Sequence, residues 1–161
     1  MTKSNIATAG GLVLSLILAS SPASAAFSPF RAMAGSWAGD GILSMANGDR
    51  QRLRCRASYG VAGHGDEMRL NLRCASDSYN FDLAGNVVDR GGAISGDWTE
   101  ATRNASGTIE GRAAGDHIEA SARGQNFAAN LSLTTRGGRQ TISIRPQGSD
   151  VRAVSLALGR R

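Results

Sequence analysis

The chain has 161 residues, of which 21 are glycine, 3 are proline and 2 are cysteine, and its formal net charge is +5. An apolar content of 41% is enough for a packed core, which excludes a wholly disordered chain, and the length allows one domain of ordinary size. The glycines follow no Gly-X-Y repeat, which excludes a collagen. Lys3 is the only lysine among the 18 basic residues, so arginine carries the remaining positive charge.

The first 25 residues have the pattern of a secretory signal peptide. Lys3 supplies a positive start, residues 10–19 form a short uncharged apolar run, and residues 23–25 (Ala-Ser-Ala) have the small-x-small form of a cleavage site. We therefore expect residues 1–25 to be removed and residues 26–161 to form one exported domain, periplasmic or extracellular, where disulfides persist. No later apolar run approaches the roughly 20 residues of a membrane-spanning helix, so we expect no integral span after cleavage.

A short helix is predicted before the first strand. Ser28 can cap it, and Pro29 suits its first position because proline lacks the N–H that is unpaired there. Phe27, Phe30 and Met33 would then close one end of the molecule as an apolar plug.

From residue 36 onward the chain alternates apolar and polar residues in short segments separated by glycine-rich turns, which predicts antiparallel strands. A hairpin of residues 51–62 and 67–75 places Cys55 opposite Cys74, and facing residues lie on one side of a sheet. In an oxidising compartment this pairing predicts a disulfide. Two buried free thiols are the alternative.

The same rule, that facing residues lie on one side of the sheet, predicts a continuous apolar face across all the later hairpins. The predicted pairs are Cys74–Tyr79, Leu72–Phe81, Leu83–Trp98, Val87–Ile94, Trp98–Ile109, Ala113–Ile118, Ala122–Phe127, Leu133–Ile142 and Ile142–Val154, with Leu43–Cys55 for the first strand. The result is an up-and-down antiparallel meander of about ten strands. Closure into a barrel would remove both exposed edges. A β-sandwich is the alternative, but its crossovers need a long connection, and every connection here is short.

Gly35-Ser36-Trp37 at the start of the first strand, after a short helix, resembles the opening of the lipocalin/calycin barrels. That resemblance implies that an arginine on the last strand packs over the tryptophan, and Arg160 is the matching residue. The blocks at residues 35–39, 54–59, 72–79 and 91–98 also resemble a group of small exported proteins of Gram-negative bacteria, a resemblance that implies no particular activity.

The sequence offers little catalytic chemistry. His64 falls in a turn, and His117 and Glu119 share an outer face, but two ligands do not make a structural metal site. Glu100 and Glu110 face each other in the predicted register, yet paired carboxylates on an exterior hairpin are more often solvent charges than a glycosidase pair. We therefore expect a protein that is not an enzyme and has no metal and no cofactor.

The inward residues of the middle strands suggest a binding function. Several are small, which would leave a cavity for a small apolar or amphiphilic ligand such as a lipid. The small residues are Gly96, Gly111, Ala113, Ala120, Ala122 and Ala129, and the large residues expected to line the ligand are Trp37, Tyr59, Phe81, Trp98 and Phe127. The alternative is a barrel whose walls pack together and leave no cavity.

A second hypothesis concerns the outer face of the disulfide hairpin. It carries Arg52, Arg54, Arg56 and Arg73, with Arg56 directly opposite Arg73. Facing like charges cost stability, so an anionic lipid or glycan of the cell envelope would be a suitable partner. Nucleic acid is not expected, because few aromatic side chains lie among these arginines. A solvated face partly neutralised by Asp77 opposite Arg52 is the alternative.

Overall fold

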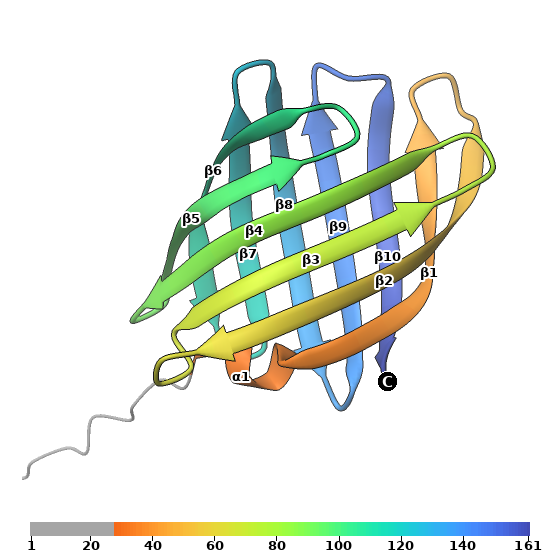
Figure 1. The fold of residues 1–161 in the computed structure, drawn as a ribbon. Coiled ribbons are helices and arrows are strands. Elements are labelled where there is room, and N and C mark those ends of the chain that lie inside the picture. The colour runs from red at the N-terminus through yellow and green to blue at the C-terminus, as the bar shows by residue number, and fades with distance from the viewer. Residues whose placement is uncertain (1–27) are drawn as a thin grey trace, which may run out of the picture.

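The computed structural model describes residues 28–161, so the predicted signal peptide (residues 1–25) and Phe27 lie outside the described residues. One short helix precedes ten strands: α1 (Phe30–Met33), β1 (Gly35–Met45), β2 (Arg50–Ala62), β3 (Glu67–Ala75), β4 (Asn80–Arg90), β5 (Ala93–Glu100), β6 (Ala105–Ala114), β7 (His117–Gly124), β8 (Phe127–Arg136), β9 (Arg139–Gln147) and β10 (Val151–Arg160). Consecutive strands are antiparallel neighbours, and β1 also pairs with β10, so the sheet closes into a barrel (Figure 1). The predicted all-β meander barrel is confirmed.

The barrel has two different ends. The helix α1 lies at one of them, which we call the helix end, together with the C-terminus (Figure 1). The connections β1–β2, β3–β4, β5–β6, β7–β8 and β9–β10 lie at the opposite end, which we call the far end.

Alternation of inward and outward side chains produces this fold. Along β2, Leu53, Cys55 and Tyr59 are buried while Arg54 and Arg56 between them are exposed. Such a strand places one apolar face toward the interior and one polar face toward water. Within residues 28–161, no helix is long and apolar enough to cross a membrane.

The predicted register is correct in three hairpins and wrong in the others. The β2–β3, β6–β7 and β8–β9 pairs are confirmed, including Cys55 opposite Cys74. The other connections between β3 and β10 differ by two residues; Cys74, for example, faces Phe81 and not Tyr79. The first hairpin differs by four residues, since Gly39, and not Leu43, faces Cys55. Every difference is an even number, so the residues of the predicted apolar pairs keep their predicted face.

Turn chemistry explains these differences. Between β4 and β5 the turn is Gly91-Gly92, with φ of 63° and 92°, one residue later than predicted. Two positive φ angles in succession are what a two-residue hairpin turn of the favoured twist requires, and glycine adopts them freely. Asp89 supports the turn by accepting a hydrogen bond from the Gly92 N–H at 2.7 Å.

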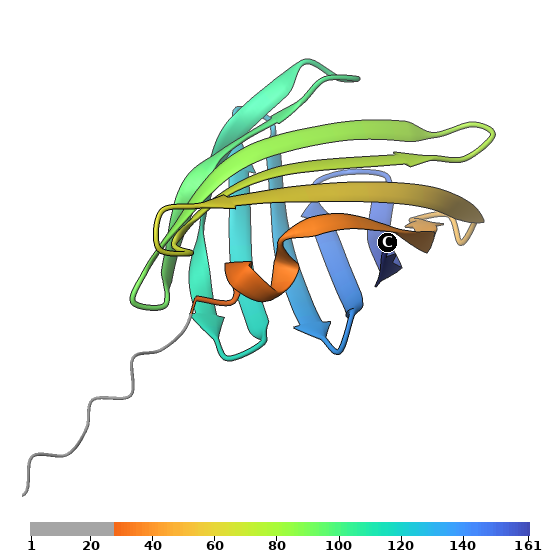
Figure 2. The ribbon, with the colours of Figure 1, turned by 60° about the horizontal axis from the view of Figure 1, so that its bottom comes forward.

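The helix end is closed by α1, which lies across it (Figure 2). Phe30 and Met33 are almost completely buried and contact the core, as predicted for the plug. The first helical residue is Phe30 and the capping position is Pro29, one residue later than predicted, while the Ser28 hydroxyl accepts a hydrogen bond from the Phe30 N–H at 3.4 Å. The plug leaves the far end as the only end not covered by a helix among the described residues.

A buried polar chain lies in the wall of the barrel. The Tyr59 hydroxyl donates to the Gln140 side-chain oxygen at 2.7 Å, and the Gln140 amide donates to the Thr135 hydroxyl at 3.0 Å. Burial raises the pKa of Tyr59, so its hydroxyl stays protonated and keeps its role as donor.

Trp37 and Arg160 join the first strand to the last. The guanidinium carbon of Arg160 lies 4.5 Å from the centre of the Trp37 ring, as the lipocalin/calycin resemblance implies. Arg160 also donates to the carbonyl oxygens of Ala34 and, at 2.5 Å, Ala32, and the Trp37 indole N–H donates to the Met33 carbonyl at 2.7 Å. This contact therefore fixes α1 against the seam where the barrel closes.

The predicted disulfide is confirmed. Cys55 and Cys74 are bonded, with 4.2 Å between their Cα atoms, and both are buried on the inner face. The bond ties β2 to β3 in addition to their backbone hydrogen bonds, and it leaves no free cysteine among residues 28–161.

Arg160→Ala should lower the free energy of unfolding by about 2 kcal/mol, because it removes a cation–π contact and two charged hydrogen bonds. Arg160→Lys should recover only part of this, since lysine cannot bond two carbonyls while stacking on the ring. Urea denaturation followed by Trp fluorescence measures both variants. Arg152→Ala, an exposed arginine of the same strand, is the control and should change stability little. Equal stability of Arg160→Ala and wild type would contradict the interpretation.

Candidate ligand cavity

The barrel contains a cavity of about 290 Å³ near the far end. Its wall is almost entirely apolar and comes from β3 to β10, whereas β1 and β2 contribute nothing to it. Arg103 and Ser149, from the β5–β6 and β9–β10 connections, line it and are exposed to solvent, so the cavity opens at this end. Its volume lies just below the range for small-molecule pockets, about 300–1,000 Å³.

The structure divides the five predicted lining residues into two groups. Phe81, Trp98 and Phe127 line the cavity. Tyr59 instead lines a second, smaller cavity of about 80 Å³, next to the helix plug. Trp37 lines neither, which corrects the prediction, because β1 runs beside the closing seam and the ring is held there under Arg160.

Two aromatic residues form a fixed part of the wall. The rings of Trp98 and Phe127 meet edge to face with centres 5.3 Å apart. The Trp98 indole N–H donates to the Thr108 carbonyl at 3.1 Å, which satisfies its polar atom within the wall. A ligand in the cavity would therefore meet the apolar parts of both rings.

The small inward residues contribute in a different way from the one predicted. A Cβ added to Gly96 would lie 2.1 Å from the Asn86 carbonyl oxygen, and one on Gly111 would lie 2.2 Å from that of Glu119. These two glycines therefore allow neighbouring strands to approach and do not open cavity space, which corrects the prediction. Ala122 and Ala129 do line the cavity.

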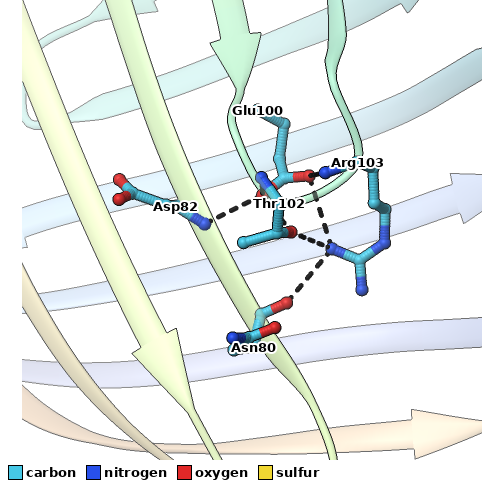
Figure 3. A network of polar contacts seen from close by, with 5 residues as sticks. All are labelled: Asn80, Asp82, Glu100, Thr102 and Arg103. Carbon is cyan, nitrogen blue, oxygen red and sulfur yellow. Dashed lines mark hydrogen bonds and ion pairs between the residues drawn. The ribbon is translucent and has the colours of Figure 1, made fainter.

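Sequence reasoning did not identify three residues at the mouth: Tyr79, Glu100 and Arg103. The Arg103 guanidinium carbon lies 4.5 Å from the centre of the Tyr79 ring. Its Nη1 donates to the Asn80 carbonyl at 3.1 Å and to the Thr102 hydroxyl at 2.8 Å (Figure 3). No sequence pattern marks a turn residue or an exposed arginine as part of a cavity mouth. Their arrangement is recognisable only in the folded loop.

Glu100 organises the loop that carries Arg103. Its carboxylate accepts hydrogen bonds from the backbone N–H groups of Asp82 at 2.9 Å, Thr102 at 3.1 Å and Arg103 at 2.9 Å, and from the Thr102 hydroxyl at 2.6 Å (Figure 3). Burial alone would raise the pKa of Glu100, but these hydrogen bonds outweigh it, so the pKa is lowered from its ordinary value of 4.5. Glu100 is thus ionised and fully occupied as an acceptor.

The predicted pairing of Glu100 with Glu110 is wrong. Glu100 faces Ala105, and Glu110 faces Ser95. Glu100 points into the barrel with its side chain 11% exposed, whereas the Glu110 side chain is 72% exposed. The two carboxylates therefore lie on opposite sides of the wall and cannot act on one bond.

His117 and Glu119 share the outer face, as predicted. The His117 Nε2 lies 2.8 Å from a Glu119 carboxylate oxygen, and its Nδ1 lies 2.8 Å from the Thr134 hydroxyl. The part of the chain that the structure describes contains no group of three or more metal-ligating side chains.

The four predicted arginines lie on the outer face. Arg52, Arg54, Arg56 and Arg73 are all exposed, and Arg56 faces Arg73 as predicted. Arg73 forms an ion pair with Asp82, its neighbour on β4, at 2.8 Å.

Asp77 does not face Arg52, which corrects the expected neutralisation. The β2–β3 ladder ends where Arg54 faces Ala75, so Asp77 lies beyond it in the β3–β4 connection. There the Gln51 side-chain oxygen accepts hydrogen bonds from the Ser76 and Ser78 hydroxyls. The acidic residues beside this arginine face are Asp82, next to Arg73, and Asp40 on β1, which faces Arg54; Asp77 is not one of them.

The closed antiparallel meander is similar in fold to two solved structures. Rv2717c from M. tuberculosis has this fold with a TM-score of 0.65 at 16% identity, covering 88% of this chain and 98% of that chain. The S-type phycobiliprotein lyase CPES from Guillardia theta matches with a TM-score of 0.56 at 10% identity, covering 82% and 90%. Neither a protein-family model nor a curated protein sequence matches the chain. At these identities the similarity shows the fold alone.

Glu100→Gln should remove a pH-dependent part of the stability. A carboxylate whose pKa is lowered on folding stabilises the protein above its unfolded pKa, here 4.5, and this contribution is lost as the pH falls through the folded value. The difference in unfolding free energy between wild type and Glu100→Gln should therefore be largest near pH 6 and shrink below pH 4.5. Urea denaturation at a series of pH values measures it. Glu110→Gln, on the exposed side of the wall, is the control, and a difference independent of pH would contradict the assignment.

Proposed function

We propose that this protein is an exported, non-enzymatic β-barrel that binds a small apolar or amphiphilic ligand in its cavity. The observation that carries the proposal is the apolar cavity of about 290 Å³, which is accessible at the far end while α1 covers the other end. Burial of an apolar ligand surface would stabilise the complex by roughly 25 cal/mol per Å² before the costs of association.

Two features support the export part of the proposal. The first is the signal-peptide pattern of residues 1–25. The second is the Cys55–Cys74 bond, since structural disulfides persist in oxidising compartments.

The proposal includes no catalytic step, because the carboxylate that lines the cavity is already engaged in hydrogen bonds. Glu100 lines the cavity, but its oxygens are engaged by the loop, and its possible partner Glu110 faces solvent. A bound ligand would therefore meet an apolar wall, and its own chemistry would be unchanged.

The test is a thermal-shift and native mass-spectrometry screen against lipids, from medium-chain alcohols and acids to phospholipids. A binder should add its mass to the protein and, at a hundred times its Kd, raise Tm by about 5–10 °C. Ala129→Phe fills the cavity and should abolish both effects. Ala128→Phe changes the preceding residue, which points to the outer face, and should leave both effects intact. Failure of every lipid to bind wild type, or unchanged binding by Ala129→Phe, would overturn the proposal.

We propose one alternative function, attachment to an anionic lipid or glycan of the envelope through the arginine face. The observation that favours it is the register, which places Arg56 directly opposite Arg73 with Arg54 and Arg52 along the same strand face. Like charges so arranged are stabilised by an anionic partner. This function needs no ligand in the cavity.

Arg54→Glu combined with Arg56→Glu should weaken binding to phosphatidylglycerol vesicles at least tenfold, because each arginine near an anionic surface contributes about 1 kcal/mol. Wild-type binding should also fall steeply between 50 mM and about 500 mM salt. The control reverses Arg112 and Arg123 on β6 and β7. Co-sedimentation measures the affinity, and equal losses in both double variants, or binding insensitive to salt, would contradict a dedicated face.

A further inference from the structure

The mouth of the cavity carries one cation whose hydrogen-bonding capacity is only partly used. Arg103 lines the cavity with its side chain 45% exposed, so its guanidinium lies between the apolar interior and solvent. The neighbouring ionic residue, Glu100, is 11% exposed and lies behind it. A ligand entering the cavity would therefore pass Arg103.

The Arg103 side chain is held in place from two sides. The bonds of Nη1 to Asn80, Thr102 and, at 3.4 Å, a Glu100 oxygen restrict its rotation on one side (Figure 3). The contact with the Tyr79 ring restricts it on the other. The loop below it is fixed in turn by the Glu100 carboxylate, which accepts the Arg103 backbone N–H at 2.9 Å. A cation fixed before binding loses little side-chain entropy when a ligand arrives.

One edge of the guanidinium remains available. All the Arg103 side-chain hydrogen bonds within residues 28–161 are made by Nη1, and none is made there by Nε or Nη2. These two nitrogens form the edge that binds two oxygens of a carboxylate or phosphate side by side. Glu100 does not occupy this edge, because its oxygens are turned toward backbone N–H groups and Nη1.

We infer that Arg103 binds the anionic headgroup of a single-chain amphiphile whose tail lies in the cavity. This inference rests on the proposed binding function and adds the class of ligand, a carboxylate or phosphate carried on an apolar chain. The headgroup would remain at the mouth in contact with water, so the charge would not need to enter the apolar interior. Tyr79 and Glu100 act as positioning residues for Arg103.

The experiment compares ligands with one chain and different heads: decanoate, decyl phosphate, 1-decanol and decyltrimethylammonium. Binding is followed by isothermal titration calorimetry and by the fluorescence of Trp98, which lines the cavity. Wild type should bind one or both anions about tenfold to a hundredfold more tightly than 1-decanol, the range expected for charged hydrogen bonds, and the cation more weakly. Comparison of decanoate with decyl phosphate identifies which anion is preferred.

The variant Arg103→Gln should reduce the affinity for the preferred anion to that for 1-decanol and leave 1-decanol binding unchanged. Arg103→Lys should recover part of the anion affinity, since it keeps the charge and loses the paired donors. Arg123→Gln, an exposed arginine on β7, is the matched control and should bind as wild type does.

The outcomes separate this inference from the proposed function. If 1-decanol and the anions bind wild type equally, the cavity binds ligands and the role of Arg103 is overturned. If Arg103→Gln weakens 1-decanol and decanoate by the same factor, the residue only supports the fold of the mouth, and the inference also fails. If no ligand binds wild type, the cavity function and the inference fail together. If Arg103→Gln does not fold, the comparison of headgroups with the wild-type protein still tests the inference.

Discussion

The structure depends on one constraint, the pairing of β1 with β10 that closes the sheet. An open ten-stranded sheet would expose two edges and one apolar face, and closure removes all three liabilities together. Trp37 and Arg160 stand on the two strands that meet at this seam, and Arg160 also binds the backbone of α1. The same pair of residues therefore supports the seam along the side of the barrel and holds in place the helix that covers one end. The larger cavity opens at the other end of the barrel, the far end.

The sequence predicted which way side chains point better than which residues face each other. Hairpin turns such as Gly115-Asp116 leave little choice of length, and the register there was correct. The Ser76–Tyr79 connection forms a longer turn, in which the Ser76 N–H donates to the Tyr79 carbonyl at 2.7 Å, and this moved the partner of Cys74 by two residues. An odd displacement would have placed apolar residues in water, so burial permits only even ones.

The site was predictable to a lesser degree for a related reason. Phe81, Trp98 and Phe127 were expected inside because their strand positions are inward, and they line the cavity. Trp37 and Tyr59 are inward as well, but whether an inward residue meets a void depends on three-dimensional packing at its level of the barrel. Arg103 escaped notice because its position follows from the hydrogen bonds of Glu100 to the loop backbone, which no periodic pattern records.

The disulfide lies between β2 and β3, and neither β1 nor β2 contributes to the cavity wall. Most of the cavity wall thus comes from β4 to β9, while β3, which carries Cys74, and β10, which carries Arg160, contribute only a few residues to it. Substitutions at Ala105, Ala122 or Ala129 can alter the size of the cavity without touching the seam, the plug or the covalent bond. The volume of the interior can therefore change through a few small side chains while the seam, the plug and the disulfide stay as they are, and a protein engineer could use this freedom to reshape the cavity.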